Sequence, residues 1–262
     1  MISRNFRIAN ARLGALKRNM LYGNPGTPEG RARGGKTTIR KFNQNPRLAK
    51  KLGFIIRKKI NYPQKGINLA ELFGVILGDG GLPGNHQLII SFNNKTDREY
   101  SLYLNSLLQR LFHVNGNILY RKGNNGADIV VSSSNLVDFL LREGLRSGNK
   151  VKNQVGIPAW IRRKPEYEKA CLRGLMDTDG SFYCHKYISG GRKYKYLKLC
   201  FTNCSRPILK FVFDVLRDLD YQAYLDGNHV SIYSVGGIKR YFKEIGTNNQ
   251  KHLKKLQGYL SN

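Results

Sequence analysis

The sequence predicts an α+β protein in which two pseudo-symmetric αββαββα halves form antiparallel sheets, preceded by a basic N-terminal extension. Three observations support this fold class. The 262-residue chain is 40% hydrophobic, as expected of a folded protein. Basic residues are concentrated in its first quarter, and two apolar segments that each end in Asp-Gly begin similar successions of elements. The predicted parts are the extension over residues 1–66, a first half over 67–160 and a second half over 161–262.

The charge of the chain limits its partners. It has 45 Lys and Arg against 17 Asp and Glu, a net charge of +28. Such a charge favours a polyanionic partner, with nucleic acid first and an anionic membrane surface second. No apolar run approaches 18 residues, so the sequence predicts no membrane span. Four cysteines are too few for a disulfide scaffold. A reducing compartment follows, either prokaryotic cytoplasm and nucleoid or, because the first 20 residues are Arg-rich and acid-free, an organelle.

The extension contains few apolar residues. Residues 1–68 hold 17 Lys and Arg and a single acid, Glu29, together with many Gly, Asn and Pro. One interpretation is a flexible basic tail, and the other is a DNA-binding arm that follows phosphates and orders on binding. Short helices over 28–42 and 46–60 fit the pattern.

The first half opens with a helix that ends at Asp79-Gly80. Asn68 and Glu71 have the spacing of an N-cap with a capping box, so we expect the helix to begin there. A strand over 86–92 and an amphipathic helix over 100–111 follow. Strands over 117–121 and 127–132 and a helix over 135–143 complete the half.

The second half repeats this order. Its first helix starts at Pro165 and stops at Asp179-Gly180, 100 residues after the first Asp-Gly. A long hairpin with strands over 181–187 and 193–202 turns at Ser189-Gly190-Gly191. A helix over 208–219, strands over 221–225 and 230–233 and a helix over 238–245 follow.

The two Asp-Gly helices carry the chemistry. Small residues spaced by four allow two such helices to pack closely; these are Gly74 with Gly78 and Gly174 with Thr178. Gly80 and Gly180 fit helix C-caps, but an acid before each glycine faces the negative end of the helix dipole. Asp79 and Asp179 would also repel each other unless a divalent cation lay between them. The pattern indicates metal-assisted hydrolysis of phosphodiesters.

The segments Leu72–Gly80 and Leu172–Gly180 resemble two LAGLIDADG motifs, the first with Leu77 where an acid often stands. With the matching element order, residues 60–262 resemble a single-chain LAGLIDADG homing endonuclease. The resemblance implies a monomer that uses Mg²⁺, or Mn²⁺ in its place, to cut a long, non-palindromic site in double-stranded DNA. It also implies metal binding by Asp79, Asp179 and the backbone of Gly78 and Thr178, and a structural role for Asp177.

The resemblance implies supporting residues as well. Asn94 and Asn203 match the polar residue that holds metal-bound water at the end of a strand, although a one-residue slip would substitute Asn93 and a loop cap is the alternative for Asn94. Lys150 and Lys251 match lysines near the scissile phosphate. Their alternative role is that of ordinary solvated lysines.

The sheets of similar proteins lie over successive major grooves. The candidate DNA contacts are Asn85, Gln87, Lys95, Lys186, Arg192, Lys193, Lys195 and Lys198. The alternative for the hairpin is an edge whose charges prevent aggregation. Two other functions stay open: an RNA-binding intron maturase and a DNA-binding regulator that has lost cleavage. Retention of both acids counts against the regulator.

Overall fold

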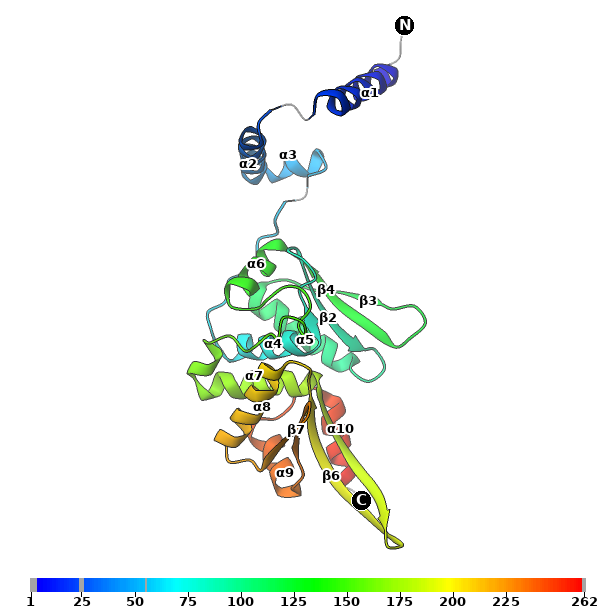
Figure 1. Ribbon diagram of the computed structural model, residues 1–262, viewed down its shortest axis with the longest axis vertical. Helices are drawn as coiled ribbons and strands as arrows, with labels where there is room; N and C mark the ends of the chain where they lie inside the picture. The colour runs from blue at the N-terminus through cyan, green and yellow to red at the C-terminus, as the bar shows by residue number, and fades with distance from the viewer. Residues whose placement is uncertain (1–3, 24–25, 55, 261–262) are drawn as a thin grey trace. The chain divides into compact units, whose positions relative to one another are not determined.

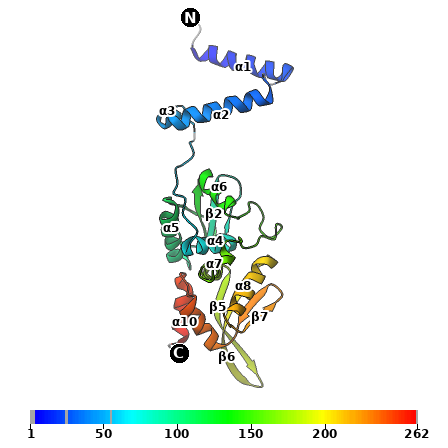
Figure 2. The same cartoon turned by 90° about the vertical axis from the view of Figure 1, so that its left-hand side faces the viewer.

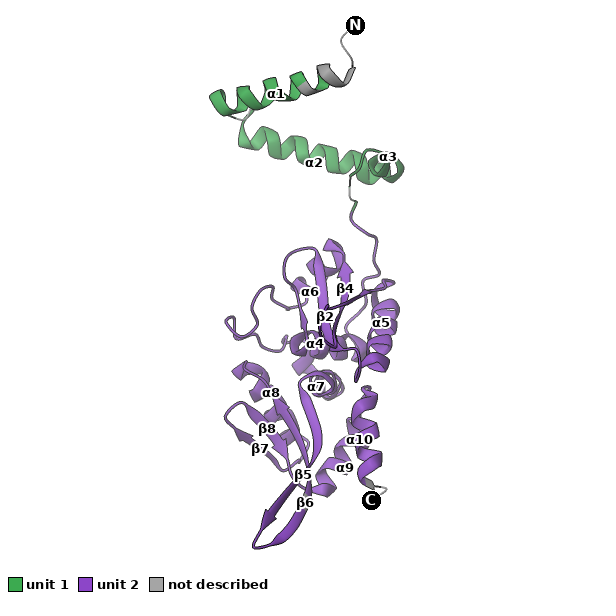
Figure 3. Cartoon of the chain, turned by 90° about the vertical axis from the view of Figure 1, so that its right-hand side faces the viewer, with its two compact units in different colours: residues 1–56 green, residues 57–262 purple. Residues whose placement is uncertain are grey.

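The computed structural model describes residues 4–23, 26–54 and 56–260, and it divides the chain into two compact units, residues 1–56 and 57–262 (Figure 3). The second unit begins earlier than the predicted boundary at residue 67, because the preceding segment packs on it. Asn61 N donates to Phe112 O at 3.0 Å. The main-chain oxygens of Lys58 and Lys65 accept hydrogen bonds from Asn135 and Tyr167.

The first unit contains helices α1 (Arg4–Tyr22), α2 (Pro28–Gln44) and α3 (Pro46–Lys51). Thr27 and Asn45 cap α2 and α3 through their side-chain oxygens, and each helix opens with proline. The helix over 28–42 is confirmed. The helix over 46–60 is much shorter than the pattern allows, since Gly53 takes φ +78° just beyond it. Helix α1 was not predicted.

The first half of the second unit follows the predicted order. Its elements are α4 (Ile67–Gly78), β1 (Gly80–Gly81), β2 (Gln87–Asn93), α5 (Arg98–Phe112), β3 (Asn117–Tyr120), β4 (Gly126–Ser132) and α6 (Ser134–Arg142). The antiparallel sheet has the order β1-β2-β4-β3. Burial alternates along β2 and β4, so one sheet face packs on the core and the other is outward.

The second half repeats this architecture. Its elements are α7 (Pro165–Thr178), β5 (Gly180–Ser189), β6 (Arg192–Thr202), α8 (Arg206–Asp218), β7 (Ala223–Asp226), β8 (His229–Ile232), α9 (Val235–Glu244) and α10 (Gln250–Leu260). The sheet order β5-β6-β8-β7 matches that of the first half. The two-copy prediction is therefore confirmed; α10 is an addition that the periodicity did not predict.

Helices α4 and α7 lie side by side at the centre of the second unit, between the two sheets (Figures 1 and 2). The predicted N-cap at Asn68 is wrong, because α4 begins at Ile67 after Gly66. Glu71 makes no capping box; it is buried and paired with Arg173 of α7. The pairing joins the halves, which explains a charge at this depth. None of the helices in the described ranges is long and apolar enough to cross a membrane.

Candidate active site

Helices α4 and α7 approach each other at glycines. A Cβ on Gly74 would lie 2.1 Å from Cys171 O, and a Cβ on Gly174 would lie 2.3 Å from Glu71 O. Side-chain carbons do not tolerate such distances, so only glycine fits at both positions. The close helix packing predicted from the small residues is confirmed.

The two candidate metal-binding carboxylates stand where these helices end. Asp79 and Asp179 are the C-cap residues of α4 and α7. The helix ends are also near each other, because a Cβ on Gly78 would lie 2.0 Å from Thr178 Oγ1 and 3.5 Å from Asp179 Oδ2. The structure therefore gathers the four predicted metal-binding positions in one place.

Burial and mutual repulsion oppose the ionisation of these acids. Burial, reinforced by the charge of Asp179, raises the pKa of Asp79 from 3.8 to about 6. Burial also raises the pKa of Asp179, although the hydrogen bond from Asn203 and the charge of Lys150 act against it. Two partly desolvated carboxylates that repel each other form a site that a cation would stabilise.

Lys150 places a positive charge between the two halves. Its Nζ donates to Leu77 O at 3.0 Å, to Ile76 O at 3.4 Å and also to Gly78 O, all at the C-terminal end of α4. Burial lowers the pKa of Lys150, while both carboxylates pull it up. The ammonium group thus complements the negative end of the helix dipole and the acid pair.

Lys251 does not occupy the equivalent position. Its Nζ forms an ion pair with Asp97 Oδ1 at 2.8 Å. At the end of α7 an amide takes the place of the lysine, because Asn249 Nδ2 donates to Asp177 O at 3.0 Å and to Asp97 Oδ1 at 2.7 Å. The two halves of the site are therefore electrostatically unequal, although Lys251 still lowers the pKa of Asp79.

The two predicted asparagines also differ. Asn203 Nδ2 donates to Asp179 Oδ2 at 2.7 Å, so the structure brings this pair together. Among the described residues Asn94 makes no side-chain hydrogen bond to Asp79; its backbone N donates to Asn125 O at 2.7 Å. Asn93, the alternative, caps the following turn by accepting from the backbone N of Lys95. The first half therefore lacks a counterpart of Asn203 at this contact.

The buried motif residue Asp177 is occupied by structural contacts. It accepts hydrogen bonds from Thr247 Oγ1 and, at 2.8 Å, from Asn248 N. Asn248 Nδ2 donates in turn to Glu71 Oε1 at 2.6 Å and to the hydroxyl of Tyr103 at 2.8 Å. Asp177 thus belongs to the polar network that joins the halves, where burial raises its pKa to about 7.

Strand register divides the hairpin residues between two faces. Tyr183 follows the buried Phe182 and therefore points outward, as does Ser189 six residues later. Their strand partners Lys198 and Arg192 lie on the same outward face. Aromatic rings share that face, and Tyr187 stacks on Tyr194 with ring centroids 5.0 Å apart.

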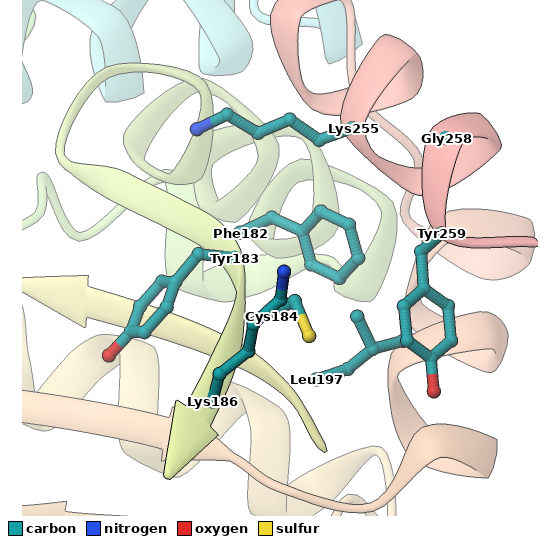
Figure 4. Close-up of a pocket in the computed structure, with 8 residues that line it drawn as sticks. All are labelled: Phe182, Tyr183, Cys184, Lys186, Leu197, Lys255, Gly258 and Tyr259. Carbon is teal, nitrogen blue, oxygen red and sulfur yellow. The ribbon is translucent and has the colours of Figure 1, made fainter. Parts of the chain in front are cut away.

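The other hairpin lysines follow the opposite alternation. Lys186 pairs with Lys195 and Ile188 pairs with Lys193, and these residues lie on the same face of the hairpin as the buried Phe182. Phe182, Lys186 and Lys255 of α10 line a hollow of about 340 Å³ (Figure 4). In that view Phe182 and Tyr183 point to opposite sides of β5. The side chain of Lys195 lies outside the described part of the structure.

The first-half candidates lie around the outward face of β2. Gln87 Nε2 donates to Ser132 Oγ of β4 at 3.3 Å. Asn85 precedes β2 and contacts His86 at 3.4 Å, and Lys95 is exposed in the turn after β2. Asn85, Gln87 and Lys95 thus place polar groups around the outward face of the first sheet.

Sequence reasoning missed several polar residues of the site region. The polar Thr-Asn-Asn-Gln run before Lys251 is a sequence signal for Asn249, whereas the spacing between the two halves indicates only the lysine. Ser91 and Asp128 are polar residues at period-two positions of otherwise apolar strands, which is a signal for an outward functional face. They bond to each other at 2.8 Å and to Arg121.

Comparison with known proteins gives structural matches only. No family model and no curated protein matches the sequence. A structure of the LAGLIDADG homing endonuclease I-LtrWI bound to target DNA is 12% identical, covers 74% of this chain and 89% of that chain, and has a TM-score of 0.51. The LAGLIDADG meganuclease I-AabMI bound to uncleaved DNA is 14% identical, with coverages of 73% and 88% and a TM-score of 0.49. I-DmoI in complex with DNA and Mn is 17% identical, with coverages of 70% and 97% and a TM-score of 0.44.

The architecture and the I-LtrWI match define the class of fold. Two αββαββα halves meet at paired helices that each end in an aspartate, and their sheets have the same strand order. This chain has the fold of the LAGLIDADG homing endonucleases.

Proposed function

We propose that this chain is a site-specific endonuclease that makes a double-strand break in a long, non-palindromic DNA target by Mg²⁺-dependent phosphodiester hydrolysis. The observation that carries the proposal is the placement of Asp79 and Asp179 at the adjoining ends of α4 and α7. Paired carboxylates on a dyad-like helix contact suit a reaction that must take place on two strands.

The residues present fit a hard divalent cation. Asp79, Asp179 and the main-chain oxygens of Gly78 and Thr178 are oxygen donors, which Mg²⁺ and Mn²⁺ prefer. The raised pKa values of both acids are the electrostatic sign that a positive charge would be favourable there. A cation at this position would polarise the phosphate and activate water for attack.

The protein's own residues would orient the reaction. Asn203 fixes the carboxylate of Asp179 and keeps it in a single orientation. Lys150, held at the end of α4, would stabilise the negative charge that develops on the phosphate. Lys251 would contribute less directly, because Asp97 neutralises it.

DNA binding is assigned to the outward faces of the two sheets and to the first unit. The outward residues of the two halves differ, with Tyr187, Arg192 and Lys198 in the second and Gln87 in the first, so a non-palindromic target follows. Residues 1–56 carry 13 Lys and Arg and one acid, and their described side chains are almost all exposed. They would bind backbone phosphates without reading sequence.

The test is cleavage of a randomised duplex library by the full chain with Mg²⁺. Wild-type protein is compared with Asp79→Asn and with Asp218→Asn, which removes an exposed carboxylate of helix α8 as a matched control. Recurrent cuts made by wild type and Asp218→Asn but lost in Asp79→Asn support an endonuclease. Specific retention of duplexes without cutting would favour a regulator, and preference for structured RNA over duplex DNA would favour a maturase.

A further inference from the structure

Three side chains on the outward face of the first sheet form a closed hydrogen-bonded cluster. Arg121, directly after β3, donates from Nε to Asp128 Oδ2 at 3.0 Å and from Nη2 to Asp128 Oδ1 at 2.5 Å. The same Nη2 donates to Ser91 Oγ at 2.8 Å, and Ser91 Oγ donates to Asp128 Oδ1 at 2.8 Å. We call this set the Arg121 cluster.

The Arg121 cluster fixes a guanidinium and leaves one end of it available. Asp128 occupies the Nε–Nη2 edge, while Nη1 has no hydrogen-bond partner among the described residues. The side chain of Arg121 is 49% exposed and that of Asp128 is 19% exposed. Hydrogen bonding to Arg121 holds the pKa of Asp128 below its usual value, so the pair stays charged. An arginine immobilised in advance loses little side-chain entropy when it binds.

The cluster lies next to the candidate metal site. Ser91 N donates to Asp79 O at 3.0 Å. Ser91 and Asp79 also line the same hollow of about 360 Å³. A duplex seated with a phosphate at Asp79 would therefore present its neighbouring base pairs to this part of the sheet.

The cluster suits a base better than a phosphate. Asp128 cancels the charge of Arg121 and would repel a phosphate, and the excess of 45 Lys and Arg over 17 Asp and Glu supplies other basic side chains for backbone contacts. What the ion pair adds is a fixed guanidinium plane. Guanine offers two acceptors, N7 and O6, at its major-groove edge, and the Nη1 group of Arg121, which has no partner among the described residues, can donate to that edge.

We propose that Arg121, positioned by Asp128 and Ser91, reads a guanine in one of the base pairs nearest the cut made by the first half. The proposal rests on the proposed function. It applies to that half alone, since the corresponding residues of the second sheet are Thr202, whose N donates to Asp179 O at 3.3 Å, and His229. Thr202 Oγ1 and His229 Nδ1 are 2.8 Å apart and present no guanidinium.

The experiment measures binding and cleavage of a recovered target in which every position is replaced by each base pair. The full chain is compared with Arg121→Ala, Arg121→Lys and Arg57→Ala. Arg57 is the matched control, because it also pairs with an aspartate, Asp138, but on helix α6. Thermal unfolding checks that each variant is folded.

Wild type should prefer guanine at one position, and Arg121→Ala should reduce that preference roughly 10- to 100-fold while the other positions keep theirs. Arg121→Lys should also reduce it, since lysine keeps the charge but not the planar fork. Arg57→Ala should leave every preference intact.

Two results would overturn the assignment while leaving the proposed function in place. Uniform weakening over all sequences by Arg121→Ala, with a flatter salt dependence, would make Arg121 a phosphate contact. Lower stability with unchanged base preferences would make the cluster purely structural. A chain that neither binds nor cuts any duplex would overturn the proposed function as well.

Discussion

Replacing Asp79 by Asn should make the metal-free protein more stable while it removes cleavage. In the folded chain burial and the charge of Asp179 raise the pKa of Asp79 from 3.8 to about 6. Because the folded pKa is the higher one, ionising Asp79 costs the folded state more than the unfolded state. The free energy of unfolding therefore falls as pH rises from about 4 to about 6, and this cost is fully present above pH 7.

The size of the effect follows from the two pKa values. A difference of about two between them corresponds to at most about 3 kcal/mol, and because Asp79 still has solvent-exposed surface, screening by water reduces the expected cost at pH 8 to about 1 kcal/mol. Asp79→Asn removes this cost, so urea denaturation in EDTA should show an increase of about 1 kcal/mol at pH 8 and almost none at pH 4. The exposed control Asp218→Asn should change the free energy of unfolding by less than about 0.5 kcal/mol at either pH.

A loss of stability in Asp79→Asn at pH 8 would refute this account of the site. It would mean that the carboxylate is satisfied by contacts within the protein and needs no cation. An equal gain at pH 4 and pH 8 would also refute it, because the gain would then have nothing to do with charge.

Four further outcomes are expected. Gly174→Val should destabilise the protein by about 3 kcal/mol or more, since a Cβ there meets Glu71 O at 2.3 Å. The control Gly236→Ala should not destabilise it, because a Cβ there meets nothing within 4 Å. Chemical denaturation measures the free energy of unfolding of both variants. In EDTA, Lys150→Met should move the pH range over which the free energy of unfolding falls to higher pH, because Lys150 lowers the pKa of Asp79; urea denaturation at several pH values measures this shift. Asp97→Asn should break the ion pair of Lys251 and change the relative rates at which the two DNA strands are cut. Nicking of a supercoiled plasmid measures these rates, and unchanged rates would show that the ion pair is irrelevant to catalysis. Deletion of residues 1–56 should weaken DNA binding and flatten its salt dependence, and an unchanged slope would show that this unit does not contact phosphates.

The sequence predicts the repeated elements well, because periodicity is strong in both halves. The helix containing residues 100–111 and the strands around 86–92 and 127–132 appear with bounds that differ by a few residues. Propensity could not distinguish a helix start at Ile67 from a capping box at Asn68. The tertiary structure determines the helix start, because Glu71 forms an ion pair with Arg173 of the other half and does not cap its own helix.

The candidate site was predictable only in part. The two aspartates follow from the repeat itself, and Asn203 lies where the strand end puts it. Spacing predicts Lys251 and Asn94, but it does not show that Asp97 binds Lys251 or that β2 continues past Asp79. Strand register explains why Asn94 does not reach Asp79 as Asn203 reaches Asp179. Asp79 O accepts from Ser91 N, whereas Asp179 O accepts from Thr202 N, one residue before Asn203.

The central claim is that Asp79 and Asp179 act together as one metal-dependent centre. The most direct measurement compares wild type, Asp79→Asn and Asp179→Asn on a single recovered duplex, with Mg²⁺ and with EDTA. Wild type should cut only with Mg²⁺, and each variant should bind the duplex specifically without making the double-strand break. Cutting at the wild-type rate by either variant, or by wild type in EDTA, would contradict the claim.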